Sequence, residues 1–259
     1  MLNFAPPAVS LRFAPVWRRN LLVWRKLAIP SILGNLADPM IYMLGLGYGL
    51  GSFLPQVEGV PYISFLAAGT VCLSTMNSAT FEAMYSAFSR MHVQRTWDAI
   101  TNAPIELDDV VLAELVWAAS KSVLSGLAIL VVIWALGLSG SALALWVIPL
   151  LPLIGLTFGA LGLAMTALAR SYDFFMYYFT LVITPMIMVS GVFFPAEQLP
   201  AAFQAIAGFL PLIHAVALAR PLLFGQVPAD ILLHIGVMLA YAVAGFYAAA
   251  ILCRRRLLK

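Results

Sequence analysis

The chain has 259 residues, of which 63% are hydrophobic and only 10% are charged. Soluble domains are typically about 45–50% apolar and about 25% charged, so this composition indicates an integral membrane protein without a separate soluble catalytic domain. The net charge of +3 then gives no reason to expect nucleic acid as a partner. The two cysteines, Cys72 and Cys253, form neither a disulfide framework nor a metal-ligand pattern.

Residues 1–28 are expected to form an N-terminal segment that contains a basic interfacial helix. Apolar residues recur there at helical spacing, at Trp17, Leu21, Trp24 and Ala28. The other faces carry the cations Arg18, Arg19, Arg25 and Lys26. This arrangement is typical of an amphipathic helix that lies in the plane of a membrane surface.

The remaining apolar stretches predict six transmembrane helices, because a hydrocarbon core roughly 30 Å thick requires about 20 helical residues per crossing. The expected spans are approximately Ile29 to Phe53, Tyr62 to Phe88, Val110 to Leu136, Ala142 to Ala169, Tyr172 to Gly191 and Ile231 to Cys253. Within the first span, Asp38 and Pro39 form an N-cap and first-turn pair that is compatible with a helix restart. Prolines break residues 192–229 into pieces too short to cross, which predicts short re-entrant helices in the outer leaflet.

The positions of lysine and arginine orient this bundle. All of them except Lys121 and Arg220 fall in the N-terminal segment, the second and fourth loops, and the C-terminal tail. Cytoplasmic loops carry an excess of these residues, so both termini are predicted to be cytoplasmic.

The second loop, residues 89–109, is the longest polar segment of the chain. Its core, Thr96 to Thr101, predicts a short helix with Thr96 as N-cap, ended by Pro104. Two interpretations remain open from composition: a helix parallel to the membrane that docks on a cytoplasmic partner, or a solvated connector.

Ionisable groups inside the spans form a second set of candidates. A charge at mid-membrane costs about 2.5–3.5 kcal/mol on insertion scales, so such groups are expected to face protein, water or one another. Glu114 and Lys121 are two helical turns apart, so each is expected to meet a partner on another helix. A buried polar clamp and a hydrophilic path for a substrate headgroup both fit the full set Glu82, Glu114, Lys121, Asn35 and Asn77.

Other features favour structural interpretations. The aromatic cluster from Tyr172 to Phe179 is typical of an interfacial belt, and the glycines between Gly45 and Gly51 allow close helix packing. His214 and His234 are isolated in sequence and predict no ligand site. Gly137-Leu-Ser139-Gly140 matches the GxSG pattern of intramembrane serine proteases, but Ser139 falls in a loop rather than at a helix start within the bundle.

Several motifs resemble type-2 ATP-binding-cassette exporter permeases. The stretch that follows the fifth span, Ser190-Gly-Val-Phe-Phe-Pro-Ala-Glu-Gln-Leu-Pro, is similar to the signature found there in that family. Gly34-Asn-Leu-Ala-Asp-Pro-Met-Ile-Tyr, Gln94-Arg-Thr-Trp-Asp-Ala-Ile and Ser171-Tyr-Asp-Phe-Phe resemble one subfamily, the nodulation protein J type of lipooligosaccharide permease. The similarity extends over nearly the whole chain.

The resemblance implies a homodimeric permease that exports amphiphiles such as lipochitin oligosaccharides. It also implies two copies of a separate ATPase that binds ATP and Mg²⁺, since this sequence has no GxxxxGK[ST] phosphate loop. No cofactor or catalytic residue is expected in this chain. The implied ATPase-coupling residues are Arg90, Gln94, Arg95, Thr96, Trp97, Asp98, Ile100 and Pro104. The outer re-entrant signature comprises Ser190, Gly191, Phe193, Phe194, Pro195, Leu199 and Pro200.

Trp97 and Ile100 are expected to fill an apolar cleft on the ATPase, while Arg95 and Asp98 supply polar contacts at its rim. The cargo itself stays open, because a drug, polysaccharide or other lipid exporter on the same scaffold fits the sequence equally well.

Overall fold

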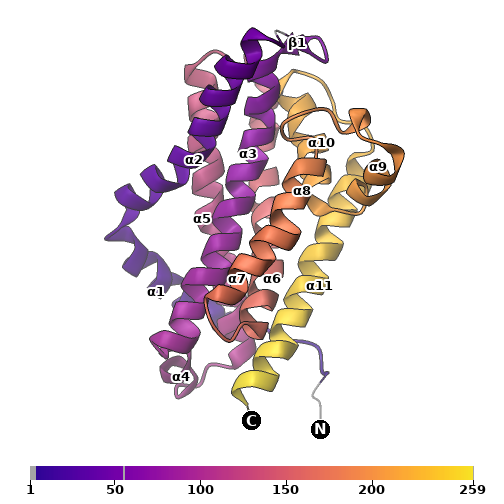
Figure 1. The fold of residues 1–259 in the computed structure, drawn as a ribbon. Helices are drawn as coiled ribbons and strands as arrows, with labels where there is room; N and C mark the ends of the chain where they lie inside the picture. Colours follow the sequence, from indigo (N-terminus) through magenta and orange to yellow (C-terminus); the bar gives the residue numbers. More distant parts are fainter. Residues whose placement is uncertain (1–3, 55, 259) are drawn as a thin grey trace.

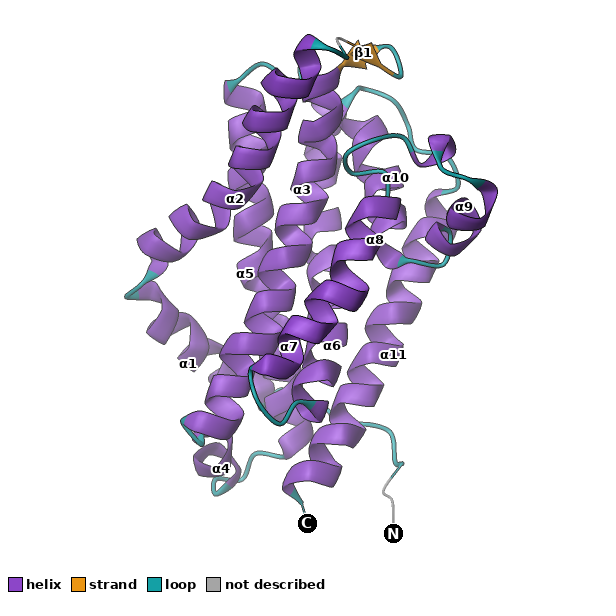
Figure 2. Ribbon diagram, in the orientation of Figure 1, coloured by secondary structure: helices purple, strands orange, loops and turns teal. Residues whose placement is uncertain are grey.

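The computed structural model describes residues 4–54 and 56–258, with the side chain of Asp38 left out. Helices α2 (Ala28–Gly49), α3 (Tyr62–Phe81), α5 (Leu107–Ala135), α6 (Leu150–Leu168) and α11 (Ile231–Leu257) run along one common direction, together with the rod formed by α7 (Asp173–Tyr178) and α8 (Thr184–Val189) (Figure 1). Most of the described chain is helical (Figure 2).

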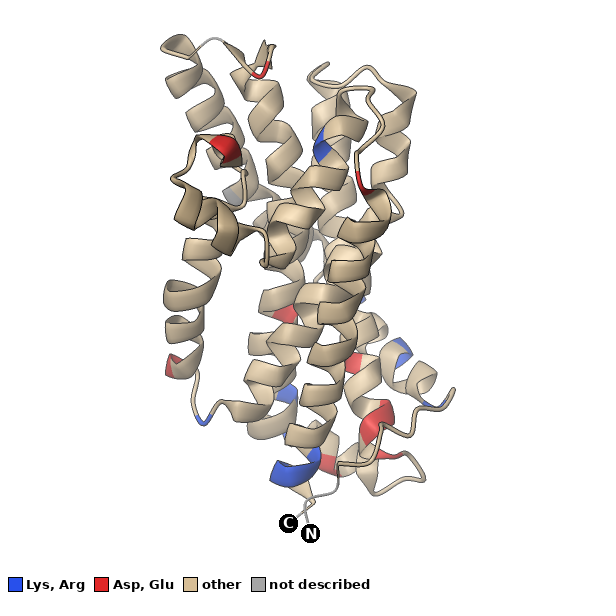
Figure 3. Ribbon diagram, turned by 90° about the vertical axis from the view of Figure 1, so that its right-hand side faces the viewer, with Lys and Arg blue, Asp and Glu red and all other residues tan. Residues whose placement is uncertain are grey.

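Both ends of the described chain lie at one end of this bundle (Figure 1), which we call the basic end. Figure 3 shows that most of the charged residues lie in this half of the molecule. The opposite end carries a two-residue antiparallel hairpin, β1 (Gln56–Val57) with β2 (Val60–Pro61), and we call it the hairpin end.

The N-terminal helix α1 (Phe13–Arg25) turns toward the bundle rather than lying free of it. It meets α2 at an angle of 82° and packs against α5. Trp17, Leu21, Trp24 and Ala28 are all half-buried, as an amphipathic helix requires, and Val16 is fully covered. Helix α2 continues through Pro39 without a break, so the helix restart considered there does not occur.

Helix α3 is buried over most of its length and is prolonged by two π-helical turns, η2 (Glu82–Ser86) and η3 (Ser89–Val93). It packs against α2, α5, α6 and α10 (Pro211–Leu223). Helix α6 is the centre of the bundle, since it contacts α3, α5 and α11. Among the described residues, two large apolar clusters fill the interior, and a smaller third one surrounds Phe65.

Residues 192–229 form a chain of short elements at the hairpin end. The turn η6 (Ala196–Gln198) leads to α9 (Ala201–Ala207), which meets α10 at 89°. Pro200 and Pro211 immediately precede or begin these helices, where the missing proline N–H removes no helical hydrogen bond. The apolar side of α10 is buried in the bundle.

By length and composition, three helical segments of the described chain are able to cross a membrane: α5, residues Ala142–Leu168, and α11. The number rises to five if each bent pair, α1 with α2 and α9 with α10, counts as one span. The segment Ala142–Leu168 begins with the 3-10 turn η4 (Ala142–Val147) and continues as α6. The rod of α7, the π-helical turn η5 (Phe179–Ile183) and α8 is shorter, at Asp173–Val189. The predicted six-span count therefore stays a prediction.

Candidate coupling network and docking surface

Two wide helical turns place the first charged residues of the candidate site. Glu82 opens the π-helical turn η2, and Arg90 lies in η3. Such turns occur frequently at functional sites because they redirect side chains and free backbone carbonyls. Here Thr166 of α6 donates its hydroxyl hydrogen to the freed carbonyl of Ala83, at 2.7 Å, so the widened helix is held by its neighbour.

Glu82 is buried, with 3% of its surface exposed, and its carboxylate is fully engaged. The Lys121 ammonium donates to Oε2 at 2.8 Å, while the Trp117 indole and Arg90 donate to Oε1 at 2.8 and 2.9 Å. Lys121 and Trp117 belong to α5, so this carboxylate joins α5 to the extension of α3. A buried carboxylate is tolerated only when it is paired in this way.

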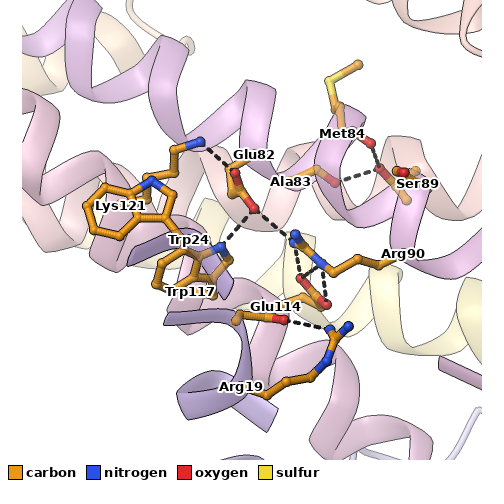
Figure 4. A network of polar contacts seen from close by, with 12 residues as sticks. Arg19, Trp24, Glu82, Ala83, Met84, Ser89, Arg90, Glu114, Trp117 and Lys121 are labelled. Atoms are coloured by element: carbon orange, nitrogen blue, oxygen red, sulfur yellow. Dashed lines mark hydrogen bonds and ion pairs between the residues drawn. The ribbon is translucent and has the colours of Figure 1, made fainter. Parts of the chain in front are cut away.

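Glu114 is the second buried carboxylate, at 1% exposure. Arg90 donates Nε to it at 2.9 Å and a terminal nitrogen at 2.5 Å, which is a bidentate pairing. The Trp97 indole completes the site with a hydrogen bond to Oε1 at 3.2 Å. Figure 4 shows how Arg90 bridges the two carboxylates and how Lys121 reaches Glu82 from the opposite side. Glu114 and Lys121 thus each meet a partner on another helix.

The short helix α4 (Thr96–Thr101) contains four of the expected docking residues, Thr96, Trp97, Asp98 and Ile100, and the structure corrects some of the expected roles. Trp97 is fully buried and points to Glu114, so the prediction that its ring fills a cleft on a partner is wrong. Arg90 is likewise mostly buried and pairs with Glu82 and Glu114 inside the bundle. The predicted N-cap is wrong by one residue: Arg95, with φ of 49°, occupies that position, and Thr96 is already helical.

The residues of this segment that do face outward form a polar surface at the basic end, which we call the α4 surface. Its side chains are exposed because α4 has only six residues and directs one face inward. Ile100 is half-buried against the cluster around Trp97, and Thr96 is half-buried as well. The α4 surface consists of Gln94, Arg95, Asp98, Thr101, Asn102 and Pro104.

A cavity of about 440 Å³ lies beside the charged network, between α1 and the extension of α3. The basic residues on its wall are Arg19, Arg90 and Lys121, and Glu82 also lines it. The carboxylate of Glu82 therefore belongs to a clamp and to a polar cavity wall at once. The alternatives that the sequence left open are not mutually exclusive here.

Asn35 and Asn77 do not line this cavity. The Asn35 amide donates to the Ser78 hydroxyl across 3.4 Å, which ties α2 to α3. Asn77 is half-buried on α3. Within the described chain, these two residues are thus placed apart from the Glu82 network.

Sequence reasoning missed a third charged site, the first turn of α5. Asp108 accepts hydrogen bonds from Arg254 of α11, at 2.7 Å for Nε, and from the backbone N–H of Ala8, also at 2.7 Å. Asp109 accepts from both the N–H and the hydroxyl of Ser10, at 2.6 and 2.8 Å. Carboxylates are favourable at a helix N-terminus, and the acidic pair before an apolar run was the available signal. We call this group the acidic clamp.

The outer signature surrounds the turn that follows α8. Gly191 adopts φ of +75°, which favours glycine, and its carbonyl accepts a hydrogen bond from Arg220 of α10. The Arg220 guanidinium also lies 3.7 Å from the ring centre of Phe65. Tyr62 donates its hydroxyl hydrogen to the Phe193 carbonyl at 3.0 Å. These contacts hold the segment after the fifth predicted span against α3 and α10.

The other signature residues occupy the same region. Ser190 is buried and donates to the Met186 carbonyl at 2.5 Å. Phe194 and Pro195 line a second cavity of about 690 Å³ at the hairpin end, together with Phe193. Leu199 and Pro200 connect η6 with α9.

The structure also places the two histidines and the serine of the GxSG pattern. His214 and His234 contact each other, because their Nδ1 atoms lie 2.7 Å apart in a hydrogen bond between α10 and α11. Ser139 donates its hydroxyl hydrogen to the Leu223 carbonyl at 2.6 Å, so this serine serves to attach a loop to α10.

A family model described as "ABC-2 type transporter" matches residues 12–224. The chain belongs to the ABC-2 type transporter family. This family consists of membrane transport permeases, in agreement with the apolar helices described above.

Within the ABC-2 family, the chain is similar to nodulation protein J from several rhizobia. It is 50% identical to the protein of Rhizobium leguminosarum bv. viciae, over 98% of both chains. The identity to nodulation protein J of Bradyrhizobium diazoefficiens is 49%, over 98% of this chain and 97% of that one. A more distant relative is the inner membrane transport permease YadH of Escherichia coli, at 21% identity over 90% of each chain.

Proposed function

We propose that this chain is the permease subunit of an ATP-driven exporter of lipooligosaccharide or a related amphiphilic glycolipid. The single observation that carries this proposal is the identity of about 50% to nodulation protein J over nearly all of both chains. In this proposal two copies of the permease form a homodimer in the bacterial inner membrane. Two copies of a separate ATPase bind ATP and Mg²⁺ and drive the transport.

Charge placement supports a six-span arrangement with both termini in the cytoplasm. The lysine and arginine residues, apart from Lys121 and Arg220, fall in the N-terminal segment, the second and fourth loops and the C-terminal tail, and the positive-inside rule assigns segments rich in these residues to the cytoplasm. In this arrangement α2, α3, α5, α6, the rod of α7 and α8, and α11 are the six spans. Helices α9 and α10 enter the outer leaflet without crossing it.

The ATPase would dock on the α4 surface. Arg95 and Asp98 are exposed there and offer charges of both signs, which suits a polar interface rim. Beneath this surface, Trp97 links α4 to Glu114, and Arg90 links Glu114 to Glu82. A movement of α4 would therefore be passed directly to α5 and to the extension of α3.

Features of α2 support a dimer interface along the first span. Gly45 and Gly49 are four residues apart, and no heavy atom lies within 4 Å of a Cβ built on either one. Within the described chain, no neighbouring helix packs against these two glycines, whereas Gly47 packs closely against Ile63. Pairs of small residues at this spacing allow two transmembrane helices to approach each other closely.

Reconstituted transport tests the proposal. The permease is incorporated into vesicles with and without the proposed ATPase partner, and both ATP hydrolysis and the export of a lipochitin oligosaccharide are measured. We expect hydrolysis and export only when both chains are present. Export of a drug or a lipid-linked polysaccharide in place of the lipochitin oligosaccharide would assign a different cargo, and hydrolysis by the permease alone would refute the proposal.

Arg95→Glu tests the docking surface, with Arg18→Glu as the control because Arg18 is an exposed arginine on α1. Reversal of the Arg95 charge should reduce co-purification of the ATPase, while the control retains it. Equal retention of the ATPase by both variants would exclude Arg95 from the contact.

A further inference from the structure

The cavity beside the charged network carries more positive charge than its own carboxylates balance. Arg19, Arg90 and Lys121 line it or approach it, against the two carboxylates of Glu82 and Glu114. Arg90 and Lys121 form ion pairs with those carboxylates. Among the described residues, Arg19 donates only to the amide oxygen of Asn20, at 3.1 Å. One cation on the cavity wall is thus left for an external anion.

Asn20 provides a second, independent indication. Its side chain lines the cavity and only 3% of the residue is exposed, yet its Nδ2 has no hydrogen-bond partner in the described structure. Buried amide donors are nearly always satisfied, and an unsatisfied one lowers stability. An acceptor oxygen placed in the cavity would satisfy Asn20 and neutralise Arg19 at the same time.

The cavity also has an apolar lip. Val23 and Leu27 line it and are 55% and 63% exposed, at the bend where α1 joins α2. Trp24 lies beside them and stacks edge-on against Trp117, with ring centres 5.9 Å apart. An amphipathic helix with arginine on its polar side is the arrangement that holds a segment at the headgroup level of a membrane. The occupant is therefore expected to have an anionic head and an apolar tail.

We propose that this cavity binds the phosphodiester headgroup of an anionic phospholipid from the leaflet at the basic end. Arg19 pairs with the phosphate through its planar guanidinium, which suits two phosphate oxygens. Asn20 donates Nδ2 to a third oxygen, and the acyl chains leave over Val23 and Leu27. One phosphodiester carries the single negative charge that the five charged groups require. Figure 4 shows Arg19 on α1 beside the Glu114 side of the network.

The bound lipid would fix the position of α1. Helix α1 contacts α5 through Trp17, whose indole donates to the Ser120 hydroxyl at 3.1 Å, but its C-terminal half borders the cavity instead. A headgroup there fills the space between α1 and the extension of α3. Binding of the lipid to this site then helps to fix the angle between α1 and α2.

Native mass spectrometry of the purified permease tests this proposal without the ATPase or the cargo, so its failure would leave the proposed function untouched. The protein in a neutral detergent is titrated with phosphatidylglycerol, phosphatidylcholine and inorganic phosphate. We expect one phosphatidylglycerol per chain, with phosphatidylcholine and inorganic phosphate bound about tenfold more weakly. Equal affinity for the two lipids, or for inorganic phosphate, would refute the lipid site, and this comparison needs no variant.

A pair of neighbouring variants locates the site. Arg18→Gln and Arg19→Gln remove the same charge from α1, but Arg18 is exposed and does not line the cavity. Arg19→Gln should weaken phosphatidylglycerol binding about fivefold or more, since each cation near a membrane surface contributes about that factor. Arg18→Gln should leave the selective site intact, and Arg19→Lys should restore part of the binding. The same loss in both glutamine variants would show general surface attraction and overturn the assignment.

Discussion

The indole N–H of Trp97 donates to the Glu114 carboxylate across 3.2 Å, deep in the basic end. This bond attaches the six-residue helix α4 to the 29-residue helix α5. A helix as short as α4 has little stability of its own, so its position depends on this buried anchor. The residues that a partner can touch and the residue that fixes the helix are therefore different ones.

Trp97→Phe should separate anchoring from docking. The substitution keeps an aromatic ring but removes the donor to Glu114 and part of the buried ring volume, so the free energy of unfolding should fall by about 1–3 kcal/mol. ATP-driven export should fall as well, while the exposed α4 surface still retains the ATPase in co-purification. Trp146→Phe is the control, because Trp146 is 65% exposed. Loss of the ATPase at unchanged stability would contradict the anchoring role.

The Glu82 site should respond asymmetrically to substitution. Glu82→Ala leaves the Lys121 ammonium and the Trp117 indole without their acceptor and should cost about 3–5 kcal/mol, as when one partner of a buried pair is removed. Lys121→Met should cost less, because Arg90 and Trp117 still donate to Glu82. Denaturant unfolding of the detergent-solubilised protein measures both values. Equal losses would mean that Lys121 contributes most of the stabilisation of this carboxylate.

Gly69 should tolerate no side chain. A Cβ atom there would lie 2.7 Å from the carbonyl oxygen of Val192 and 2.9 Å from its Cα, so Gly69→Ala should lower stability by about 1–3 kcal/mol through overpacking. Gly236→Ala on α11 is the matched control, because no heavy atom of the described residues lies within 4 Å of its Cβ position, apart from its chain neighbours and its own helix backbone. Helix propensity should make that variant more stable by up to about 1 kcal/mol. Thermal unfolding of the two variants compares them directly.

Cross-linking should locate the dimer interface. Chains carrying Ile41→Cys on α2 are mixed with chains carrying Leu181→Cys on the fifth predicted span, after Cys72 and Cys253 are replaced by alanine. Ile41 and Leu181 are 67% and 71% exposed. We expect an oxidised dimer that no longer exports. Leu232→Cys on α11, at 87% exposure, should not cross-link to Ile41→Cys. A cross-link to position 232 in place of position 181 would move the interface to α11.

Hydropathy was sufficient to place the long helices, because apolar runs of about 20 residues rarely form anything other than a membrane-spanning helix. The predicted spans from Val110 and from Ile231 agree closely with α5 and α11. The motifs were sufficient to identify the family. Neither hydropathy nor the motifs could show that the Trp97 side chain points into the bundle, since a six-residue helix is too short for a periodic pattern to define its inner face.

The sequence could predict which residues belong to the charged network, but not which of them pair with each other. That ionisable residues in the spans need partners follows from the cost of burying charge, but Glu82 and Lys121 are separated by 39 positions. Glu82 begins a π-helical turn, and neither hydropathy nor residue spacing indicates such a turn in advance. The same limit applies to the acidic clamp, whose members are about 100 and 146 positions apart.

The acidic clamp sets an order of events during biosynthesis. Asp108 at the start of α5 binds Ala8 near the beginning of the chain and Arg254 near its end. The ribosome makes residue 8 and residue 108 long before residue 254, so the N-terminal segment can bind the start of α5 before Arg254 has been made. The contacts at the basic end are therefore complete only after the last helix has been inserted and Arg254 has paired with Asp108.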